Sequence, residues 1–401
     1  MNKIIIVGGG FGGIRTALDL EKIFRKDLSV SITLIDQRDY HLFNPNLYKV
    51  AASEEELTSI SQLKQSIALP FKEILAKRKI NFLKGRILGM DFNLRKISVK
   101  GKSLDYDYLI LATGSIPNFY QIPGASEFAL SLNNLTDAFR IRNAVEFALQ
   151  AGQYSIQKKT IRIVLAGGGF SSVKLAGELM GLLDFVAWKN NYPKEKLEVE
   201  ILESQERLMP GESGKLSQDS YFRLKNLGVQ ISFFRHIVKV DRHLIEFLNG
   251  EKMEYDLLIW TAGNKANSKL DGLLGYRNGK EKIEVNEFLE VKGADRVFAI
   301  GDLSFYKDAQ GNQTASTYKN AVSQGKYLAS ALPKLMKNVR PQAFKPKPYS
   351  FTINIGKNWA IYKGTSKYLT GYAAYLLGWY SQFVYFRSLV GIRKTLRHLL
   401  S

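Results

Sequence analysis

The residues whose types and spacing could do chemistry are a group of glycines near the start of the chain and a carboxylate that follows them. Gly8, Gly10 and Gly13 form the pattern G-x-G-x-x-G, and Asp36 comes 23 residues after Gly13. Glycines at this spacing permit a tight turn, a close approach of the backbone to a pyrophosphate, and close packing of a helix on a strand. An acid at the position of Asp36 accepts hydrogen bonds from ribose hydroxyls. The pattern therefore predicts a site for the ADP half of a dinucleotide.

A strand, a helix and a second strand must position this site, and the sequence predicts all three. Residues 3–7 are a short apolar run, a helix-compatible segment extends to about Lys26, and residues 31–35 form a second apolar run that ends at Asp36. A helix that begins at the glycines directs its free N–H groups and the positive end of its dipole at a phosphate. An accidental glycine cluster is the alternative, and the strand, helix and acid in register argue against it.

The same plan recurs in the middle of the chain. Its parts, in the same order, are a strand (residues 161–165), a glycine turn (Gly167, Gly169 and Ser172), a helix (residues 173–187), a strand (residues 197–202) and an acid (Glu203). Two dinucleotide sites in one polypeptide are the arrangement needed for a flavin and a nicotinamide cofactor. The repeat is a stronger signal than either glycine pattern alone.

The second copy differs from the first in ways that bear on its ligand. Ser172 brings a side chain to the point where the helix approaches the strand, so we expect slightly looser packing there. Glu203 would repel a 2′-phosphate and therefore favours NADH over NADPH. Lys174 lies in the first helical turn, where a cation opposes the helix dipole unless a bound anion compensates it. A solvated surface lysine is an equally good interpretation of Lys174.

Further strand ends carry small residues that let a cofactor approach the backbone closely. They are Ala112, Thr113 and Gly114 after the buried run 107–111, Gly263 after the similar run 256–260, and Gly301 with Asp302 after residues 296–300. Asp302 could hold the ribityl or pyrophosphate region of a flavin. Residues 40–50 are expected to form a loop that could line a ligand, although His41 could equally be a bystander on the surface. We expect residues 80–83 and 96–99 in a small antiparallel insert, and residues 314–332 in a helix.

Composition limits the chemistry and the partners. The 401 residues include no cysteine, which excludes disulfide exchange, cysteine–metal sites and iron–sulfur clusters, and the four histidines show no metal-ligand spacing. The net charge of +20 favours an anionic surface, either nucleic acid or phospholipid. No nucleic-acid motif is found, so we expect no nucleic-acid partner. A strand that begins at residue 3 leaves no room for a signal peptide, and we expect the protein to stay in the compartment where it is made.

These motifs resemble those of the two-dinucleotide flavoprotein oxidoreductases and, among them, the type II (non-proton-pumping) NADH:quinone oxidoreductases. The residues that carry the resemblance are 7–13, 34–36, 40–43, 46–48 with Val50, 107–115, 175–179, 297–302 and 324–327. The resemblance implies FAD held without a covalent bond in the first site and NADH in the second. It also implies a membrane quinone as electron acceptor and a homodimer.

Two departures from the family's pattern concern the reacting region. The family usually has P-T-G-x-E where residues 170–174 are F-S-S-V-K, so Lys174 replaces a glutamate. The family's quinone-site pattern A-Q-x-A-x-Q-Q falls on residues 318–324, where only Ala321 and Gln324 are kept. By resemblance, the N-terminus of the helix expected from Thr314 stabilises the reduced flavin. We hypothesise that Lys319 adds positive charge there.

Other activities can be weighed against this one. Disulfide reductases and sulfide:quinone reductases need cysteines, which the sequence lacks. A ferredoxin or rubredoxin reductase lacks the basic C-terminal tail but shares the core plan, so it stays open as a minor alternative. A flavin-binding membrane or scaffold protein with weakened NADH oxidation stays open, because Ser172 and Lys174 alter the second site and the quinone pattern is eroded.

The C-terminal tail has the composition of a membrane-surface segment. Residues 368–386 carry no charge, and apolar residues then recur at helical spacing beside basic ones: Leu389, Ile392, Leu396 and Leu399 beside Arg393, Lys394 and Arg397. Aromatic residues favour the headgroup zone, and basic residues favour anionic lipid, so we expect this segment to lie on a phospholipid surface rather than to cross it. A dimer interface or a core helix pair would use the same aromatic residues.

The sequence thus predicts an α/β fold with two Rossmann-like dinucleotide-binding domains and a C-terminal amphipathic membrane-associating segment. We expect an FAD-binding domain in residues 1–118 and 266–345, an NADH-binding domain in residues 119–265, and the C-terminal segment in residues 346–401. The expected location is peripheral, on the cytoplasmic face of the cell membrane.

Overall fold

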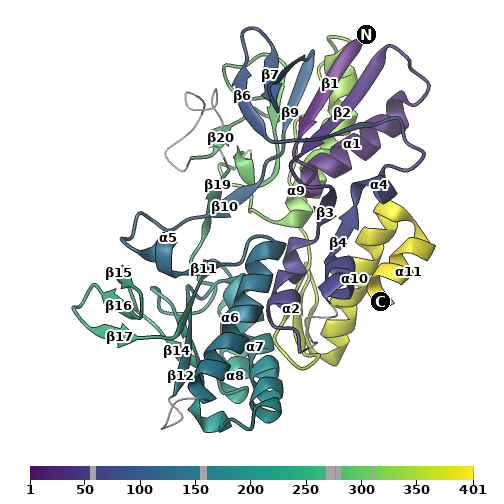
Figure 1. The fold of residues 1–401 in the computed structure, drawn as a ribbon. Coiled ribbons are helices and arrows are strands. Elements are labelled where there is room, and N and C mark those ends of the chain that lie inside the picture. The colour runs from purple at the N-terminus through teal and green to yellow at the C-terminus, as the bar shows by residue number, and fades with distance from the viewer. Residues whose placement is uncertain (55–59, 154–159, 268–275, 277–280, 309, 401) are drawn as a thin grey trace. The chain divides into compact units, whose positions relative to one another are not determined.

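The computed structural model describes the chain except for residues 55–59, 154–159, 268–275, 277–280, 309 and 401. The chain divides into two compact units (Figure 1). The first unit consists of Met1–Leu42, Ala68–Ile116 and Asn264–Tyr349, and the second consists of Phe43–Ile67, Pro117–Gly263 and Ser350–Ser401. Each unit is built around a five-stranded parallel sheet.

The sheet of the first unit has the strand order β21-β9-β1-β2-β5. Its strands are β1 (Asn2–Val7), β2 (Val30–Asp36), β5 (Asn81–Lys84), β9 (Tyr108–Leu111) and β21 (Val297–Ala299). Val7 on β1 is opposite Ile35 on β2 and Leu111 on β9. The carboxyl ends of these strands therefore meet at one edge, as is typical of ligand-binding parallel sheets.

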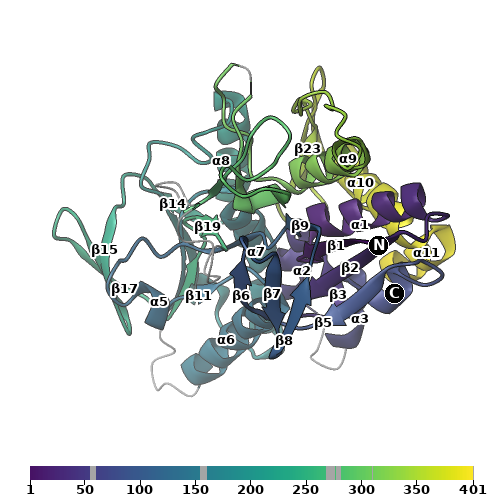
Figure 2. The same cartoon turned by 90° about the horizontal axis from the view of Figure 1, so that it is seen from above.

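Helices α1 (Phe11–Phe24) and α9 (Tyr318–Leu335) lie side by side in this unit (Figure 2). Gly325 on α9 makes the close approach possible, since a Cβ there would lie 2.6 Å from the carbonyl oxygen of Gly12. The core between helix and sheet is formed by fully buried aliphatic side chains such as Ile6 and Leu18.

The structure corrects two predictions for this unit. Residues 80–83 do not belong to an antiparallel insert, because β5 extends the main sheet parallel to β2, and the ring of Phe82 packs 4.9 Å from that of Phe71. The antiparallel sheet does exist and contains β7 (Lys96–Val99) as predicted, between β6 (Ile87–Asp91) and β8 (Lys102–Asp105).

The second correction concerns the start of α9. We predicted a helix from Thr314, and it begins at Tyr318. Thr317 caps this helix, because its side-chain oxygen accepts a hydrogen bond from the backbone N–H of Asn320 at 3.2 Å.

The sequence predicts a loop for residues 40–50, but most of these residues lie in regular secondary structure. Residues 40–42 form β3 (Tyr40–Leu42), which pairs antiparallel with β4 (Ala68–Pro70) in the first unit. In the second unit, a single turn of 3₁₀ helix (Asn44–Asn46) leads into α2 (Leu47–Ala51). Period-based reasoning fails on elements this short, since each spans only one turn or three strand residues.

The sheet of the second unit has the strand order β11-β18-β12-β13-β14. Its strands are β11 (Leu130–Ser131), β12 (Ile161–Ala166), β13 (Leu197–Leu202), β14 (Gln230–Ser232) and β18 (Leu257–Trp260), and its longer helices include α6 (Leu135–Gln153), α7 (Phe170–Lys189) and α8 (Gly214–Asn226). An antiparallel sheet of β15 (Ile237–Asp241), β16 (Leu244–Phe247) and β17 (Lys252–Glu254) joins it. Val240 and Ile245 share one apolar core with Val164 and Leu258.

The C-terminal residues pack within the second unit. They form β23 (Phe351–Asn354), β24 (Ala360–Lys363), β25 (Tyr368–Gly371), α10 (Tyr372–Val390) and α11 (Ile392–Leu400). Phe386 on α10 is fully buried and meets Phe43 with ring centroids 5.5 Å apart. Contacts thus group residues 350–401 with residues 117–263, whereas the three-part division by ligand stays a prediction.

The uncharged run 368–386 is not one helix, because it begins in β25 and continues in α10. In the part of the chain that the structure describes, no helix combines the length and the apolar character needed to cross a membrane.

Candidate functional site

The first glycine turn has the geometry that a bound pyrophosphate requires. Gly8 has a φ of +106°, and a Cβ there would lie 2.3 Å from the carbonyl oxygen of Ala112. A Cβ on Gly13 would lie 1.9 Å from the carbonyl oxygen of Gly8. A Cβ on Gly10, at the N-terminus of α1, would have no other atom within 4 Å. The turn is therefore closed on the side of the protein and open where a phosphate would approach the helix N-terminus.

Asp36 holds this turn in place. Its Oδ2 accepts a hydrogen bond from the backbone N–H of Gly9 at 2.7 Å, and its Oδ1 accepts one from the backbone N–H of Arg38 at 2.8 Å. The residue is buried, with 7% of its surface exposed. A carboxylate has about four lone-pair sites, so Asp36 keeps acceptor capacity for ribose hydroxyls.

His41 also holds the turn, which the sequence left undecided. It is fully buried, and its Nδ1 lies 2.9 Å from the carbonyl oxygen of Gly9, with the ring of Phe11 edge-on at 5.0 Å. Burial lowers the pKa of His41 to about 4, so the ring is neutral near pH 7. Because a carbonyl only accepts, Nδ1 must carry the hydrogen.

The other predicted residues of the first site follow the parallel strands β9 and β21. Thr113 donates its hydroxyl to the carbonyl oxygen of Asn267 at 3.0 Å, beside Gly114, which has a φ of +71° and open space around it. Asp302 accepts a hydrogen bond from the Ser115 hydroxyl at 2.8 Å. The structure therefore brings Ala112, Thr113 and Gly114 to the same sheet edge as the first glycine turn.

Gly301 is fixed at that edge by Gln324, a residue to which we had given no role in the flavin site. The backbone N–H of Gly301 donates to Gln324 Oε1 at 2.6 Å, while Gln324 itself is fully buried on α9. Lys319 is half-buried in the first turn of the same helix, and burial lowers its pKa. Its Nζ lies 5.9 Å from the ring centroid of Tyr318.

The second glycine turn repeats the first. Gly167 has a φ of +94°, and a Cβ there would lie 2.5 Å from the Cα of Ala262, which precedes Gly263 in the turn after β18. Gly169 faces open space at the N-terminus of α7. Ser172 takes the position of the third glycine and is fully buried, and its hydroxyl has no hydrogen-bond partner.

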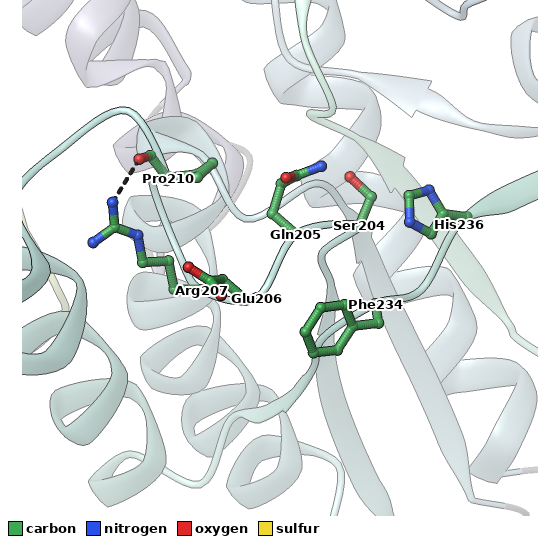
Figure 3. A pocket seen from close by; sticks show the side chains of 7 residues that line it. All are labelled: Ser204, Gln205, Glu206, Arg207, Pro210, Phe234 and His236. Atoms are coloured by element: carbon green, nitrogen blue, oxygen red, sulfur yellow. Dashed lines mark hydrogen bonds between the residues drawn. The ribbon is translucent and has the colours of Figure 1, made fainter.

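Glu203 braces the second turn as Asp36 braces the first. Its Oε2 accepts from the backbone N–H of Gly168 at 2.6 Å, and its Oε1 accepts from that of Gln205 at 2.8 Å. Beyond Glu203, the structure contains a hollow of about 500 Å³ (Figure 3). Its lining residues are Ser204, Gln205, Glu206, Arg207, Pro210, Phe234 and His236. Sequence reasoning missed this pocket, since its two sides come from loops after different strands.

Lys174 is not a solvated surface lysine. Its Nζ lies 3.5 Å from the carbonyl oxygen of Pro45 and 5.5 Å from the ring centroid of Tyr48. Burial, with a smaller contribution from Lys49, lowers the pKa of Lys174 to about 8. Burial also raises the pKa of Glu178, one helical turn further along α7. A group of ionisable side chains thus lies between α2 and α7 in the second unit.

An apolar surface runs along α10 and α11. Its exposed residues are Tyr372, Leu376, Leu377, Tyr380, Val384, Ile392 and Leu396, with exposed Arg387, Arg393 and Arg397 near its end. Four of them, Tyr372, Leu376, Tyr380 and Val384, recur every fourth residue and so share one face of α10.

Comparisons with known proteins agree with this organisation. The family model for the pyridine nucleotide-disulphide oxidoreductases matches residues 2–325. A demethylphylloquinone reductase, NdbB, from Synechocystis is 28% identical over 386 residues, which are 93% of this chain and 89% of the relative. A type II NADH:quinone oxidoreductase from Staphylococcus saprophyticus is 24% identical, over 86% of this chain and 85% of the relative.

Solved structures share the fold. The structure of NDH2 from Plasmodium falciparum in complex with NADH has a TM-score of 0.84 at 19% identity and covers 100% of this chain and 97% of its own. The sulfide:quinone oxidoreductase of Aquifex aeolicus has a TM-score of 0.79 at 17% identity, covering 97% and 92%. Since the family model spans most of the sequence, the chain belongs to the pyridine nucleotide-disulphide oxidoreductase family.

Proposed function

We propose that this protein oxidises NADH and reduces a quinone, with bound FAD as the intermediary and without pumping protons. The observation that carries the proposal is the duplicated turn, in which Gly9 and Gly168 each donate a backbone N–H to the acid at the end of the second strand. Relatives named for NADH:quinone or demethylphylloquinone reduction support the choice of substrates. The redox chemistry of bound FAD is the transfer of two electrons, from NADH and on to a quinone.

The first unit would hold FAD. The turn formed by Gly8, Gly10 and Gly13 would hold the pyrophosphate on its open side at Gly10. Asp36 would accept the ribose hydroxyls, and residues 112–114 and 301–302 would face the rest of the cofactor. The absence of a Cβ contact at Gly10 and the remaining lone pairs of Asp36 fit this group. Lys319 would add positive charge near the N-terminus of α9, which favours the electron-rich form of the flavin.

The second unit would hold NADH. The turn formed by Gly167, Gly169 and Ser172 would hold its pyrophosphate at Gly169, with Ser172 buried behind the turn. Glu203 would bind the adenosine ribose and repel a 2′-phosphate. Gly263 would let the backbone approach the nicotinamide half. With a pKa of about 8, Lys174 keeps its proton on Nζ at pH 7 and adds a positive charge where the family usually has a glutamate.

Absorption spectroscopy of the purified protein tests this function. We expect a yellow preparation whose flavin band bleaches rapidly on addition of NADH and returns when a soluble quinone is added. A colourless protein that also binds no added FAD would refute the proposal. A flavin band that bleaches slowly or not at all would favour the alternative of a flavin-binding scaffold.

We further propose that the α10–α11 surface binds an anionic phospholipid membrane, so that the protein is peripheral on the cytoplasmic face, where a lipid-soluble quinone is accessible. Exposed tyrosine and leucine side chains beside arginines are typical of such surfaces. The same surface is available for a homodimer. Sedimentation with vesicles separates these uses: binding that requires anionic lipid and weakens in salt supports the membrane, and a concentration-dependent dimer without lipid supports self-association.

A further inference from the structure

We propose that Phe234 is the platform on which the adenine ring of the nicotinamide dinucleotide stacks. This assignment rests on the proposed function, because it places the adenosine half of NADH in the pocket beyond Glu203. Phe234 lines that pocket, and Figure 3 shows its ring below the side chains of Ser204 and Gln205 in that view.

The loop that carries Phe234 is attached to the chain that follows Glu203. Strand β14 is the parallel neighbour of β13, and Phe234 comes two residues after β14 ends. The backbone N–H of Arg235 donates to the Glu203 carbonyl oxygen at 2.9 Å, and that of Phe234 donates to the Gln205 carbonyl oxygen at 3.3 Å. A base attached to a ribose on Glu203 would therefore lie within reach of the Phe234 ring.

Folding alone does not account for the position of Phe234. The residue is 69% exposed and has a φ of +57°, a left-handed conformation that is unfavourable for a bulky residue and natural for glycine. Its neighbour Phe233, by contrast, stacks on Tyr221 of α8 with ring centroids 6.0 Å apart. An exposed aromatic ring in a strained backbone beside a pocket indicates a ligand-binding role.

The remaining lining residues suit a purine base. Ser204, Gln205 and His236 offer hydrogen-bond donors and acceptors for its polar edge, and an aromatic face binds any base by stacking. The Arg207 guanidinium is held by the Pro210 carbonyl oxygen at 2.9 Å, which fixes one wall of the pocket (Figure 3). Since the ring would contact only the base, Phe234 should strengthen NADH and NADPH binding equally, and Glu203 would decide between them.

Binding of ADP-ribose to the flavin-loaded protein, measured by calorimetry, tests the assignment. We expect Phe234→Ala to weaken ADP-ribose roughly 10- to 100-fold and to raise KM for NADH by a similar factor, with kcat unchanged. Reduced nicotinamide mononucleotide, which lacks the adenosine half, should react equally with both proteins. Phe234→Trp should keep or improve ADP-ribose affinity.

The matched control is Phe222→Ala on α8, since Phe222 is 54% exposed but does not line the pocket. It should leave ADP-ribose affinity unchanged. Phe234→Gly tests whether a loss of affinity comes from misfolding. Because glycine adopts a positive φ without strain, this variant should keep the melting temperature and still lose ADP-ribose affinity.

The possible results separate this inference from the function on which it rests. Unchanged ADP-ribose affinity in both Phe234→Ala and Phe234→Gly would overturn the role of Phe234 and leave the NADH site standing. An equal loss in Phe222→Ala would do the same. If the unaltered protein binds no ADP-ribose, the NADH site of the proposed function fails, and this inference fails with it.

Discussion

The two glycine turns use the same hydrogen bonds but treat the first turn of their helices differently. In each copy the acid accepts two backbone N–H groups. One comes from the glycine between the first two pattern glycines (Gly9 or Gly168), and the other comes from the residue two positions after the acid. Two residues after the third glycine position, the first copy has Arg15 and the second has Lys174. Arg15 pairs with Asp19 at 2.5 Å, four residues along α1. Lys174 instead lies against Pro45 and Tyr48, and its pKa falls.

This difference shows how one plan supports two kinds of site. In the first copy, the ion pair with Asp19 neutralises the charge of Arg15 within its own helix. The arginine therefore adds no net charge next to the first glycine turn. A lysine that is desolvated near a second lysine keeps positive charge available at the second turn, at a cost in folding free energy. Each copy also keeps one buried polar atom without a hydrogen-bond partner, Nε of Arg15 in the first and the hydroxyl of Ser172 in the second.

The strongest test of the comparison is to place alanine at the third glycine position of each turn. Gly13→Ala would place a Cβ 1.9 Å from the Gly8 carbonyl oxygen, so we expect a loss of about 3 kcal/mol in the free energy of unfolding and a loss of bound FAD. Ser172→Ala removes a buried unpaired hydroxyl and should change stability by less than about 1 kcal/mol. Chemical denaturation of both variants measures the contrast. Equal losses would show that the two turns are packed alike.

The acids should separate the two cofactors. In Asp36→Asn and Glu203→Gln, a side-chain amide would replace one of the two accepting oxygens, so a backbone N–H would lose its partner. We expect Asp36→Asn to weaken FAD binding roughly 10- to 100-fold, and Glu203→Gln to raise KM for NADH by a similar factor with full FAD content. Each variant is the control for the other. A loss of FAD in Glu203→Gln would contradict the assignment of sites.

The cost of desolvating Lys174, which is half-buried, should depend on pH. The folded pKa of Lys174 is about 8, below its ordinary value of 10.5, so between these values the unfolded state binds the proton that the folded state has released. Stability therefore rises with pH across this window, and the burial cost is fully present below pH 8. We expect Lys174→Met to raise Tm by about 2–4 °C at pH 7, with the gain vanishing near pH 10.5.

Thermal melts at both pH values measure this effect. Exposed Lys225 on α8 provides the control, since Lys225→Met should leave the pH profile of Tm unchanged. A gain that persists in full at pH 10.5 would mean that packing of the methionine, and not removal of the charge, stabilises the variant.

The smallest expected effect concerns Lys319. This half-buried cation lies in the first turn of α9 in the first unit, to which we assign FAD under the proposed function. Its removal in Lys319→Ala should lower the reduction potential of bound FAD by on the order of 10–20 mV, because a partly exposed charge is worth less than about 1 kcal/mol. Dye-equilibrated spectra give the potential. Lys326→Ala, an exposed lysine further along the helix, is the control, and equal potentials in all three proteins would remove the role of Lys319.

Local patterns in the sequence predicted the parts of the fold that are local in the chain. The order of apolar strand, glycine turn and helix predicted both turns and both acids. These residues could be found because each set lies within one strand–helix–strand unit. The sheet position of Phe82 could not be predicted. A four-residue strand has the same residue pattern whether it pairs in a parallel or an antiparallel sheet.

Site residues supplied by distant segments were also beyond prediction. Phe234 reaches the pocket through a loop after a different strand from Glu203, and the burial of Lys174 depends on Pro45 and Tyr48, more than 120 residues earlier in the sequence. The contact of His41 with Gly9 depends on a short strand pair that has no periodic signal. A single sequence carries no information on such long-range pairings beyond residue type.

The packing of residues 43–67 has a consequence for how the protein is made. Asn46 donates its side-chain amide to Gln382, 336 residues later, at 2.7 Å, and His398 lies 3.0 Å from the carbonyl oxygen of Gln65 across a gap of 333 residues. At roughly 5–20 residues per second, a ribosome needs about 20–70 s to synthesise the missing partners. During that interval the face of Phe43 that later packs on Phe386 is uncovered, although α2 can already pack against α6 and α7, so we expect the nascent chain to benefit from a chaperone such as a ribosome-bound holdase.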